Sequence, residues 1–247
     1  MIVIPMAGAS SRFSRAGYNV PKYMLPLNGR PLFDWSVLGF KAYFETDRFL
    51  FICRDVFATE VFIRERATAL GIRRFSVVVL ERETLGQADT VDIGIAKASL
   101  TDGDELMIFN IDTIRPDIRK PTFPDADGWL ETFNDPGEAW SFVEVNQDDP
   151  QLVVRTTEKI RISDFCCTGL YGFKSRALFE KAMRRERETP QSHELYIAPI
   201  YNHLIAAGGR VRCYGVPRDE VFFSGVPQEY EALIQSPEIL SEKFALN

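Results

Sequence analysis

The sequence predicts an α/β fold in which a mixed, mainly parallel sheet lies between two layers of helices. In residues 2–111, β-branched runs that suit buried strands alternate with stretches whose apolar residues recur at helical spacing. Alternation of this kind produces parallel strands joined by helices. After residue 112 the strand candidates are shorter and are separated by Asp, Pro and Gly, which is typical of a mixed-sheet extension. No linker or repeat interrupts the 247 residues, so we expect a single domain.

Each element of this fold is predicted from its local pattern. In the first half, strands are expected at residues 2–6, 48–53, 75–80 and 105–111, and helices at 32–40, 56–70 and 87–98. Gly71 is expected to end the second of these helices. In the second half, strands are expected at 129–133, 139–145, 152–156 and 211–216, and helices at 178–187 and 195–207.

Composition narrows the class of function. A net charge of −6 and a pI near 5.2 argue against a general nucleic-acid surface, so the partners should be small molecules. The four cysteines show no C-x-x-C spacing, which indicates reduced thiols rather than a zinc or redox site. Neither a signal peptide nor a transmembrane run is evident. We therefore expect a cytoplasmic protein that binds neither nucleic acid nor membrane.

The residues after the first strand suit a nucleoside triphosphate. Small residues there let backbone N–H groups and hydroxyls approach phosphate oxygens, and these residues are Ala7, Gly8, Ser10 and Ser11. Arg12 adds a planar charged fork, and Lys22 adds a point charge in a segment that flanking prolines should hold extended. An ordinary strand-to-helix turn explains Gly8 alone but not the whole set. Neither the P-loop nor the dinucleotide-binding fingerprint is present.

This segment resembles the N-terminal signature of sugar-phosphate nucleotidyltransferases. In that family, small residues and glycine lead to an arginine and then to a Pro-Lys-x-x-x-Pro stretch, which residues 21–26 match. The resemblance extends over residues 2–233 and implies the Rossmann-like, glycosyltransferase-A-like fold of nucleotide-diphospho-sugar transferases. It further implies that residues 1–112 form a nucleotide-binding half and residues 113–247 an acceptor-binding half.

Asp112 follows a buried strand, where a carboxylate is costly unless it is paired or bound to a cation. Mg²⁺ takes carboxylate and phosphate oxygens together, although a turn aspartate is the common alternative. Residues 110–112 resemble the family's strand-end metal motif. We therefore expect Asp112 to bind Mg²⁺ and to form the catalytic set with Arg12 and Lys22.

The resemblance also implies roles for five other residues. Gly86 and Gln87 match the base-reading loop, although Gln87 could equally be an exposed first-turn helix residue. Lys159 matches a lysine that contacts the acceptor phosphate, and Gly169 matches a position near the sugar. Glu194 matches an acidic residue that accepts sugar hydroxyls, and its alternative is a helix first-turn glutamate favoured by the helix dipole.

One departure concerns the metal site. The family often ends with Trp-x-Asp-x-Gly-Thr-Pro, whose aspartate is a second metal ligand, but residues 221–227 place Phe223 at that position. Phenylalanine cannot bind Mg²⁺. The ion would rely on Asp112, phosphates and water, or would recruit another carboxylate such as Asp164 or Asp219.

The resemblance implies a Mg²⁺-dependent nucleotidyltransferase that joins a nucleoside triphosphate to a sugar phosphate or a similar small phosphate and releases pyrophosphate. It favours a pyrimidine nucleotide, a product used for surface polysaccharide or glycoconjugate, and association into a homo-oligomer. Two alternatives stay open. One is a glycosyltransferase that uses a finished nucleotide sugar, although residues 110–112 lack the first carboxylate of Asp-x-Asp. The other is a non-catalytic sensor of nucleotide sugars, which Phe223 motivates.

Overall fold

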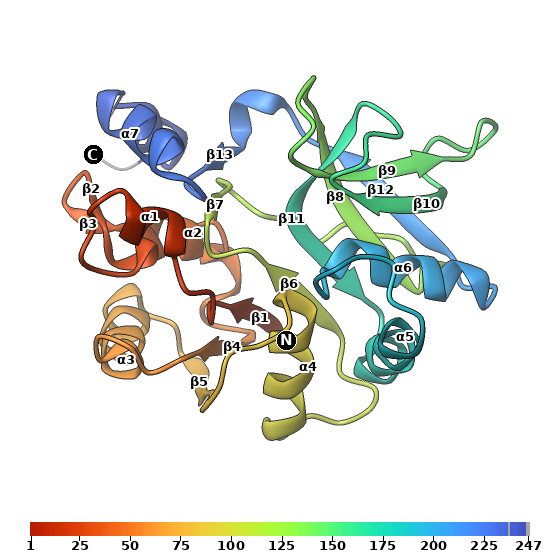
Figure 1. Cartoon of the computed structure of the whole chain (residues 1–247), viewed down its shortest axis with the longest axis horizontal. Helices are drawn as coiled ribbons and strands as arrows, with labels where there is room; N and C mark the ends of the chain where they lie inside the picture. The colour runs from red at the N-terminus through yellow and green to blue at the C-terminus, as the bar shows by residue number, and fades with distance from the viewer. Residues whose placement is uncertain (237, 246–247) are drawn as a thin grey trace.

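The computed structural model describes residues 1–236 and 238–245 of the chain. Within these residues, nine strands form one sheet with helices on both faces (Figure 1). The sheet strands are β1 (Ile2–Pro5), β4 (Arg48–Cys53), β5 (Arg74–Val79), β6 (Leu106–Phe109), β8 (Gly128–Asn134), β9 (Ser141–Val145), β10 (Val153–Glu158), β11 (Phe165–Phe173) and β12 (Val211–Gly215). Short strand pairs join β2 (Pro26–Leu27) to β3 (Arg30–Pro31) and β7 (Thr113–Ile114) to β13 (Phe222–Phe223).

Most of the helices connect or cover these strands. They are α1 (Ser11–Arg15), α2 (Leu32–Leu38), α3 (Thr59–Leu70), α4 (Gln87–Lys97), α5 (Arg176–Glu188), α6 (Ile197–Ala206), α7 (Pro227–Gln235) and α8 (Glu238–Lys243). In the described part of the chain, no helix is long and apolar enough to cross a membrane. The four cysteines are buried and unpaired.

The two helical layers follow from the alternation of side chains along each strand. In β1, Val3 packs with residues of α4, α5 and α6, whereas Ile2 and Ile4 pack with residues of α2 and α3 on the other face. The strand is fully buried because both faces are covered, as is usual for parallel sheets. The predicted mixed sheet between two helical layers is therefore confirmed.

The strand order places β1 between β4 and β6, parallel to both. The chain runs outward from β1 to β4 and β5, then returns to the other side of β1 to form β6. In open α/β sheets, ligands bind at such a reversal, outside the carboxyl ends of the strands. Here the segments at that point are residues 6–21 and 110–112.

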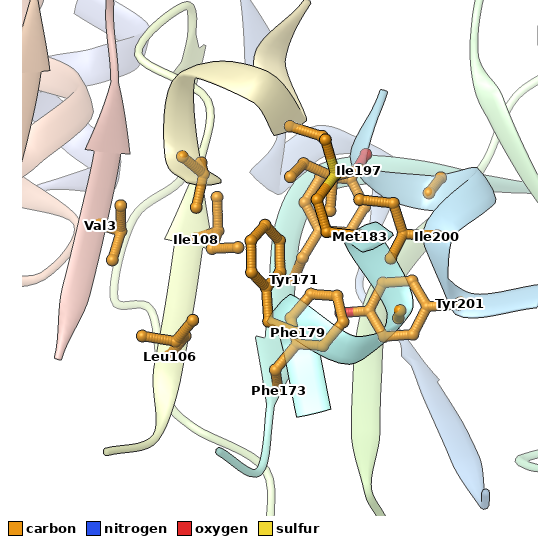
Figure 2. Packing of buried hydrophobic residues seen from close by; sticks show 14 of the residues in the cluster. Val3, Leu106, Ile108, Tyr171, Phe173, Phe179, Met183, Ile197, Ile200 and Tyr201 are labelled. Atoms are coloured by element: carbon orange, nitrogen blue, oxygen red, sulfur yellow. The ribbon is translucent and has the colours of Figure 1, made fainter. Parts of the chain in front are cut away.

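Strands β8, β9, β10 and β12 are joined to this parallel part through β11, the longest strand among the described residues. β11 runs antiparallel to β6 and also pairs with β8 and β9. Near its end, the ring of Phe173 is stacked on Tyr201 at 4.5 Å and meets the edge of Phe179 at 5.1 Å (Figure 2). Packing of this kind fixes α5 and α6 on the sheet, since each buried ring contributes about 2–3 kcal/mol.

Three sequence-based predictions need correction. β11 was not expected as a strand, because the glycines within it weaken the strand pattern. Helix α3 begins at Thr59 rather than at residue 56. The reason is that Phe57 and Ala58 have left-handed φ angles of 55° and 53°. Lys22 is not extended, because Lys22–Met24 forms a 3₁₀ turn. Pro21 suits a helix start, and Pro26 restricts only the residue before it, the extended Leu25.

Candidate active site

A cavity of about 180 Å³ lies at the carboxyl ends of β1 and β6, where the strand order reverses. Its lining includes five of the residues predicted from the sequence, namely Gly8, Ser10, Lys22, Gln87 and Asp112. These residues come from four separate segments of the chain. Gly8, Ser10 and Asp112 lie just beyond strand ends, which explains why the fold brings them together, whereas Lys22 lies in the turn after α1.

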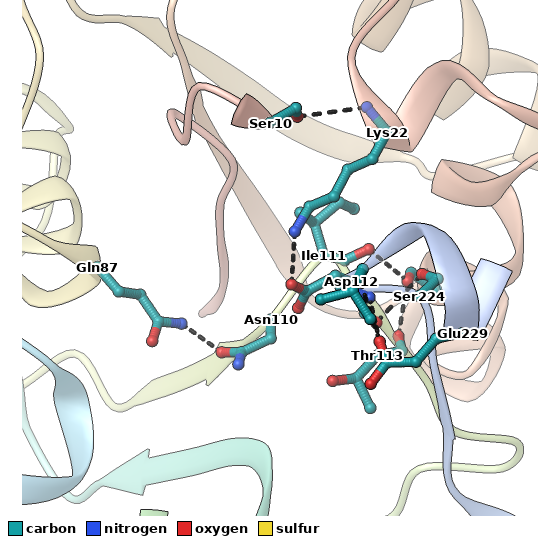
Figure 3. A network of polar contacts seen from close by, with 12 residues as sticks. Ser10, Lys22, Gln87, Asn110, Ile111, Asp112, Thr113, Ser224 and Glu229 are labelled. Atoms are coloured by element: carbon teal, nitrogen blue, oxygen red, sulfur yellow. Dashed lines mark hydrogen bonds and ion pairs between the residues drawn. The ribbon is translucent and has the colours of Figure 1, made fainter. Parts of the chain in front are cut away.

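Lys22 and Asp112 form an ion pair in this cavity. The Lys22 ammonium lies 2.5 Å from Oδ2 of Asp112, and the two side chains are 20% and 29% exposed (Figure 3). Burial alone would raise the pKa of Asp112, but the charge and hydrogen bond of Lys22 and the more distant charge of Arg12 outweigh it. The pKa of Asp112 therefore lies below its ordinary value, and the carboxylate is ionised at neutral pH.

The loop after β1 is held by its own contacts. Ser10 adopts a left-handed φ of 51°, and its hydroxyl accepts the Lys22 backbone N–H at 3.3 Å. Left-handed serine is strained and needs such support. The hydroxyl therefore links the residue before α1 to Lys22, which follows that helix.

A second cavity of about 330 Å³ adjoins the first and shares Gly8 and Ser10 with it. Ala7 lines this second cavity, as does Arg54, which follows β4 and did not stand out in the sequence. Ser11 and Arg12 lie in α1 with exposed side chains. Arg12 therefore acts on Asp112 through its charge, and no contact joins the two.

Gln87, the first residue of α4, lines the 180 Å³ cavity that contains the Lys22–Asp112 pair, which we call the reaction cavity. Its side-chain amide donates a hydrogen bond to Oδ1 of Asn110, two residues before Asp112 (Figure 3). The exposed-helix interpretation of Gln87 is therefore wrong, because the side chain is partly buried and engaged. Asn110 was noted only as part of a motif, and its contact with Gln87 joins segments 23 residues apart.

Two glycines bring segments into close contact near the cavity, Gly169 against Asn110 and Gly86 against Leu195. Gly169 has a φ of 98°, and a β-carbon there would lie 2.7 Å from Cγ of Asn110. The Asn110 backbone N–H donates to the Gly169 carbonyl at 3.1 Å. Gly86 has a φ of 141°, and a β-carbon there would lie 2.6 Å from the Leu195 carbonyl oxygen. Only glycine suits these positions.

The Gly86 contact fixes the segment that contains Glu194. The backbone of Leu195 donates to Leu85 at 2.9 Å and accepts from Ala88 at 2.8 Å. Glu194 itself is exposed, with its carboxylate 3.6 Å from His193. Because α6 begins only at Ile197, the first-turn interpretation of Glu194 is wrong.

Lys159 lies just after β10, outside the lining of the reaction cavity. Its ammonium donates to the Tyr196 hydroxyl at 2.8 Å and lies 3.9 Å from the Glu158 carboxylate. Tyr196 stands in the motif that contains Glu194, but the sequence assigns it no role, since its partner is 37 residues away.

Phe223, which stands where the family motif has its aspartate, packs its side chain against an aromatic ring. Its backbone pairs with Thr113, and its ring lies 4.4 Å from the ring of Trp140. Asp164 and Asp219 pair with Arg161 and Lys243 and do not line the reaction cavity. Neither of them is therefore available as the recruited carboxylate.

Asp112 is suited to bind Mg²⁺ as a single carboxylate ligand. Among the described residues, no group of three or more His, Cys, Asp or Glu side chains could hold a metal ion. A β-carbon on Gly225 would lie 3.1 Å from Oδ2 of Asp112 and 3.5 Å from Oε2 of Glu229, so glycine keeps space beside both carboxylates. Mg²⁺ commonly uses one or two carboxylates with phosphates and water, and Asp112 can supply one.

Comparison with solved structures identifies a relative over nearly the whole chain. A nucleoside-diphosphate-sugar pyrophosphorylase from Vibrio cholerae RC9 shares 46% sequence identity, with a TM-score of 0.90 over 95% of this chain and 100% of the relative. No family model matches the sequence, and comparison with curated proteins gives no significant match. The chain therefore belongs to the sugar-phosphate nucleotidyltransferases, the enzyme family of nucleoside-diphosphate-sugar pyrophosphorylases.

More distant structures share the fold. The inositol-1-phosphate CTP transferase from T. maritima has 14% identity and a TM-score of 0.75 over 98% of this chain and 95% of its own. A UTP-bound UGPase from Acinetobacter baumannii has 16% identity and a TM-score of 0.67 over 95% of this chain and 92% of its own. At these identities the likeness concerns the fold alone.

Proposed function

We propose that the protein is a Mg²⁺-dependent nucleotidyltransferase that joins a nucleoside triphosphate to a sugar phosphate and releases pyrophosphate. The observation that carries this proposal is the Lys22–Asp112 ion pair, which lies beside the glycine-containing loop where the strand order reverses. A cation and a carboxylate in one cavity suit a ligand that brings both phosphates and a metal ion.

In this reaction, a phosphate oxygen of the acceptor attacks the α-phosphorus in line, and the bond to the pyrophosphate oxygen breaks. The attacking oxygen is already anionic at neutral pH, so the protein supplies no general base. Lys22 and Arg12 would neutralise the triphosphate and the leaving pyrophosphate. Lys159 would hold the acceptor phosphate. Charge-assisted contacts of this kind contribute about 1.5–3 kcal/mol each.

Asp112 is the residue that would hold Mg²⁺. The bound ion would supply further charge neutralisation and a template for phosphate oxygens. The low pKa of Asp112 keeps the carboxylate ionised and therefore able to act as a ligand across the neutral range.

The nucleotide we propose is a pyrimidine triphosphate. Its support is that one distant structure is named for CTP and another is bound to UTP. Gly86 and Gln87 would contact the nucleoside, and Gly169 and Glu194 would contact the sugar. We place the product in surface polysaccharide or glycoconjugate synthesis, as the family resemblance implies.

The direct test is pyrophosphate release with Mg²⁺ across CTP, UTP, dTTP, ATP and GTP, each against a panel of sugar 1-phosphates and small phosphorylated alcohols. Release that requires both substrates supports the proposal and identifies them. No release in any combination, together with nucleotide binding in a thermal-shift assay, would contradict it.

That negative result would favour a second function, namely binding of a nucleotide sugar without turnover. The observation behind it is that Phe223, which the resemblance aligns with a metal-binding aspartate, packs its ring on Trp140. A glycosyltransferase is less well supported, because Asn110 stands where Asp-x-Asp has its first carboxylate and is bonded to Gln87. Transfer of sugar from a nucleotide sugar without pyrophosphate release would distinguish it.

A further inference from the structure

Lys159 is held in an unusual conformation outside the reaction cavity. It follows the last residue of β10 with a left-handed φ of 55°, and its backbone N–H donates to the Trp140 carbonyl at 2.9 Å. A positive φ is energetically unfavourable for lysine, so contacts with neighbouring residues must stabilise this backbone conformation. Because of this turn, the Lys159 side chain does not continue the alternating side-chain directions of β10 and instead reaches Tyr196.

Tyr196 contacts the Lys159 ammonium in two ways. Its hydroxyl accepts a hydrogen bond at 2.8 Å, and its ring centroid lies 4.7 Å from Nζ. The Glu158 carboxylate, 3.9 Å away, and Glu194 add negative charge near the same ammonium. Partial burial lowers the pKa of Lys159, but the Tyr196 hydrogen bond and these carboxylates outweigh it, so the pKa is raised overall.

Tyr196 is itself fixed to the nucleotide half. It follows Leu195, whose backbone bonds to Leu85 and Ala88 and lies against Gly86. From there, Gln87 contacts Asn110, which closely precedes Asp112. A continuous set of contacts therefore connects Lys159 to the reaction cavity through Tyr196.

We propose that Tyr196 is a positioning residue whose hydroxyl holds the Lys159 ammonium ready for the acceptor phosphate. An ammonium has three donors, so Lys159 can keep its bond to Tyr196 while it donates to a phosphate oxygen. The hydroxyl thereby lowers the entropy lost when the acceptor binds. This inference rests on the proposed function, in which Lys159 binds that phosphate.

The first test needs no substrate. Trace acetylation with acetic anhydride, read by mass spectrometry, measures the reactivity of Lys159 relative to exposed Lys97 in the same molecule. Tyr196→Phe keeps the ring but removes the hydroxyl, so the pKa of Lys159 falls and its acetylation should rise at least about threefold. Tyr43→Phe is the control, since Tyr43 also accepts a hydrogen bond, from the Lys120 backbone, elsewhere on the protein. Unchanged Lys159 reactivity would overturn the inference.

The second test uses turnover of the nucleotide that is active in the panel, with α-glucose 1-phosphate or the most active sugar 1-phosphate as acceptor. Tyr196→Phe should raise KM for the acceptor about tenfold and leave kcat and the nucleotide KM within about twofold. Combined with Lys159→Ala, it should add nothing. Additive effects, or a change in the nucleotide KM, would contradict a role through Lys159. An inactive wild-type enzyme would overturn the proposed function, while the acetylation result would still decide whether Tyr196 holds Lys159.

Discussion

The β-carbon that Gly225 lacks would lie 3.1 Å from Oδ2 of Asp112. Gly225 precedes α7, and its backbone N–H donates to the Glu229 carboxylate at 2.7 Å. The preceding residue, Ser224, donates its backbone N–H to the Asp112 carbonyl at 2.8 Å. The C-terminal region of the chain thus limits the space around the carboxylate that we assign to the metal.

Replacement of this glycine should therefore affect turnover more than stability. Gly225→Ala places a methyl group beside Asp112 in a backbone conformation that alanine can adopt, so the melting temperature should change by less than about 3 °C. Pyrophosphate release should fall at least about tenfold, because the carboxylate must shift. Gly215→Ala is the control, as a β-carbon there meets nothing within 4 Å. Equal activity of the two variants would show that the space is not needed.

Lys22→Ala should slow turnover at least about tenfold, because in the proposed reaction the triphosphate loses a charge-assisted contact in a partly buried cavity. The measurement is kcat for pyrophosphate release at saturating Mg²⁺. Lys97→Ala, which removes an exposed ammonium at the end of α4, should have no effect. Near-normal turnover of Lys22→Ala would exclude the assigned role.

The pH dependence of Asp112 has a definite sign. Because its pKa is lower in the folded state, its stabilising effect is fully present above the unfolded value of about 3.9 and is lost as the pH falls through the folded pKa. Wild type and Asp112→Asn should differ by about 1 kcal/mol or less in free energy of unfolding, since the pair is partly exposed. Urea titrations should find this difference constant from pH 5 to pH 7 and smaller below pH 4. A change between pH 5 and pH 7 would contradict the lowered pKa.

Phe223→Asp should not restore a second metal ligand. The new carboxylate would replace a ring that packs on Trp140. The Arg218 guanidinium lies 5.5 Å from the centre of that ring, so Arg218 would form an ion pair with the carboxylate. We expect a loss of about 2 kcal/mol of stability and no fall in the Mg²⁺ concentration for half-maximal activity. Phe223→Leu, which keeps apolar volume, should retain more stability. A clear fall in the Mg²⁺ requirement of Phe223→Asp would show that the carboxylate reaches the site.

Gly94→Ala tests the packing of α4 on the sheet. A β-carbon there would lie 2.3 Å from Cδ1 of Ile52, so we expect about 1–3 kcal/mol of destabilisation in urea unfolding. Ile52→Val removes that methyl group, and the double variant should lose less than the sum of the two single variants. Simple additivity would mean that the helix shifts as a whole.

The parts of the fold that depend on local pattern could be predicted from the sequence. β4 matches its predicted bounds, and the helix before Gly71 ends where expected, because burial and termination are encoded in neighbouring residues. β11 was missed because a strand that contains Gly169 has weak local preference and is stabilised by pairing with β6, β8 and β9.

The candidate site divides in the same way. Gly8, Ser10 and Asp112 could be placed because each follows a buried strand whose end meets the cavity. Tyr196 and Glu229 could not, because the partners that reveal their positions are distant in sequence or are backbone groups.

The close contact of Gly86 with Leu195 has a consequence for how such an enzyme can change. The turn that we assign to the nucleoside and the segment that we assign to the acceptor share one backbone junction with no room for a β-carbon. A substitution that reshapes one side of this junction must displace the other. The specificity for the nucleotide and the specificity for the acceptor would therefore change together during evolution. A change to a new nucleotide would require compensating substitutions around residues 194–196.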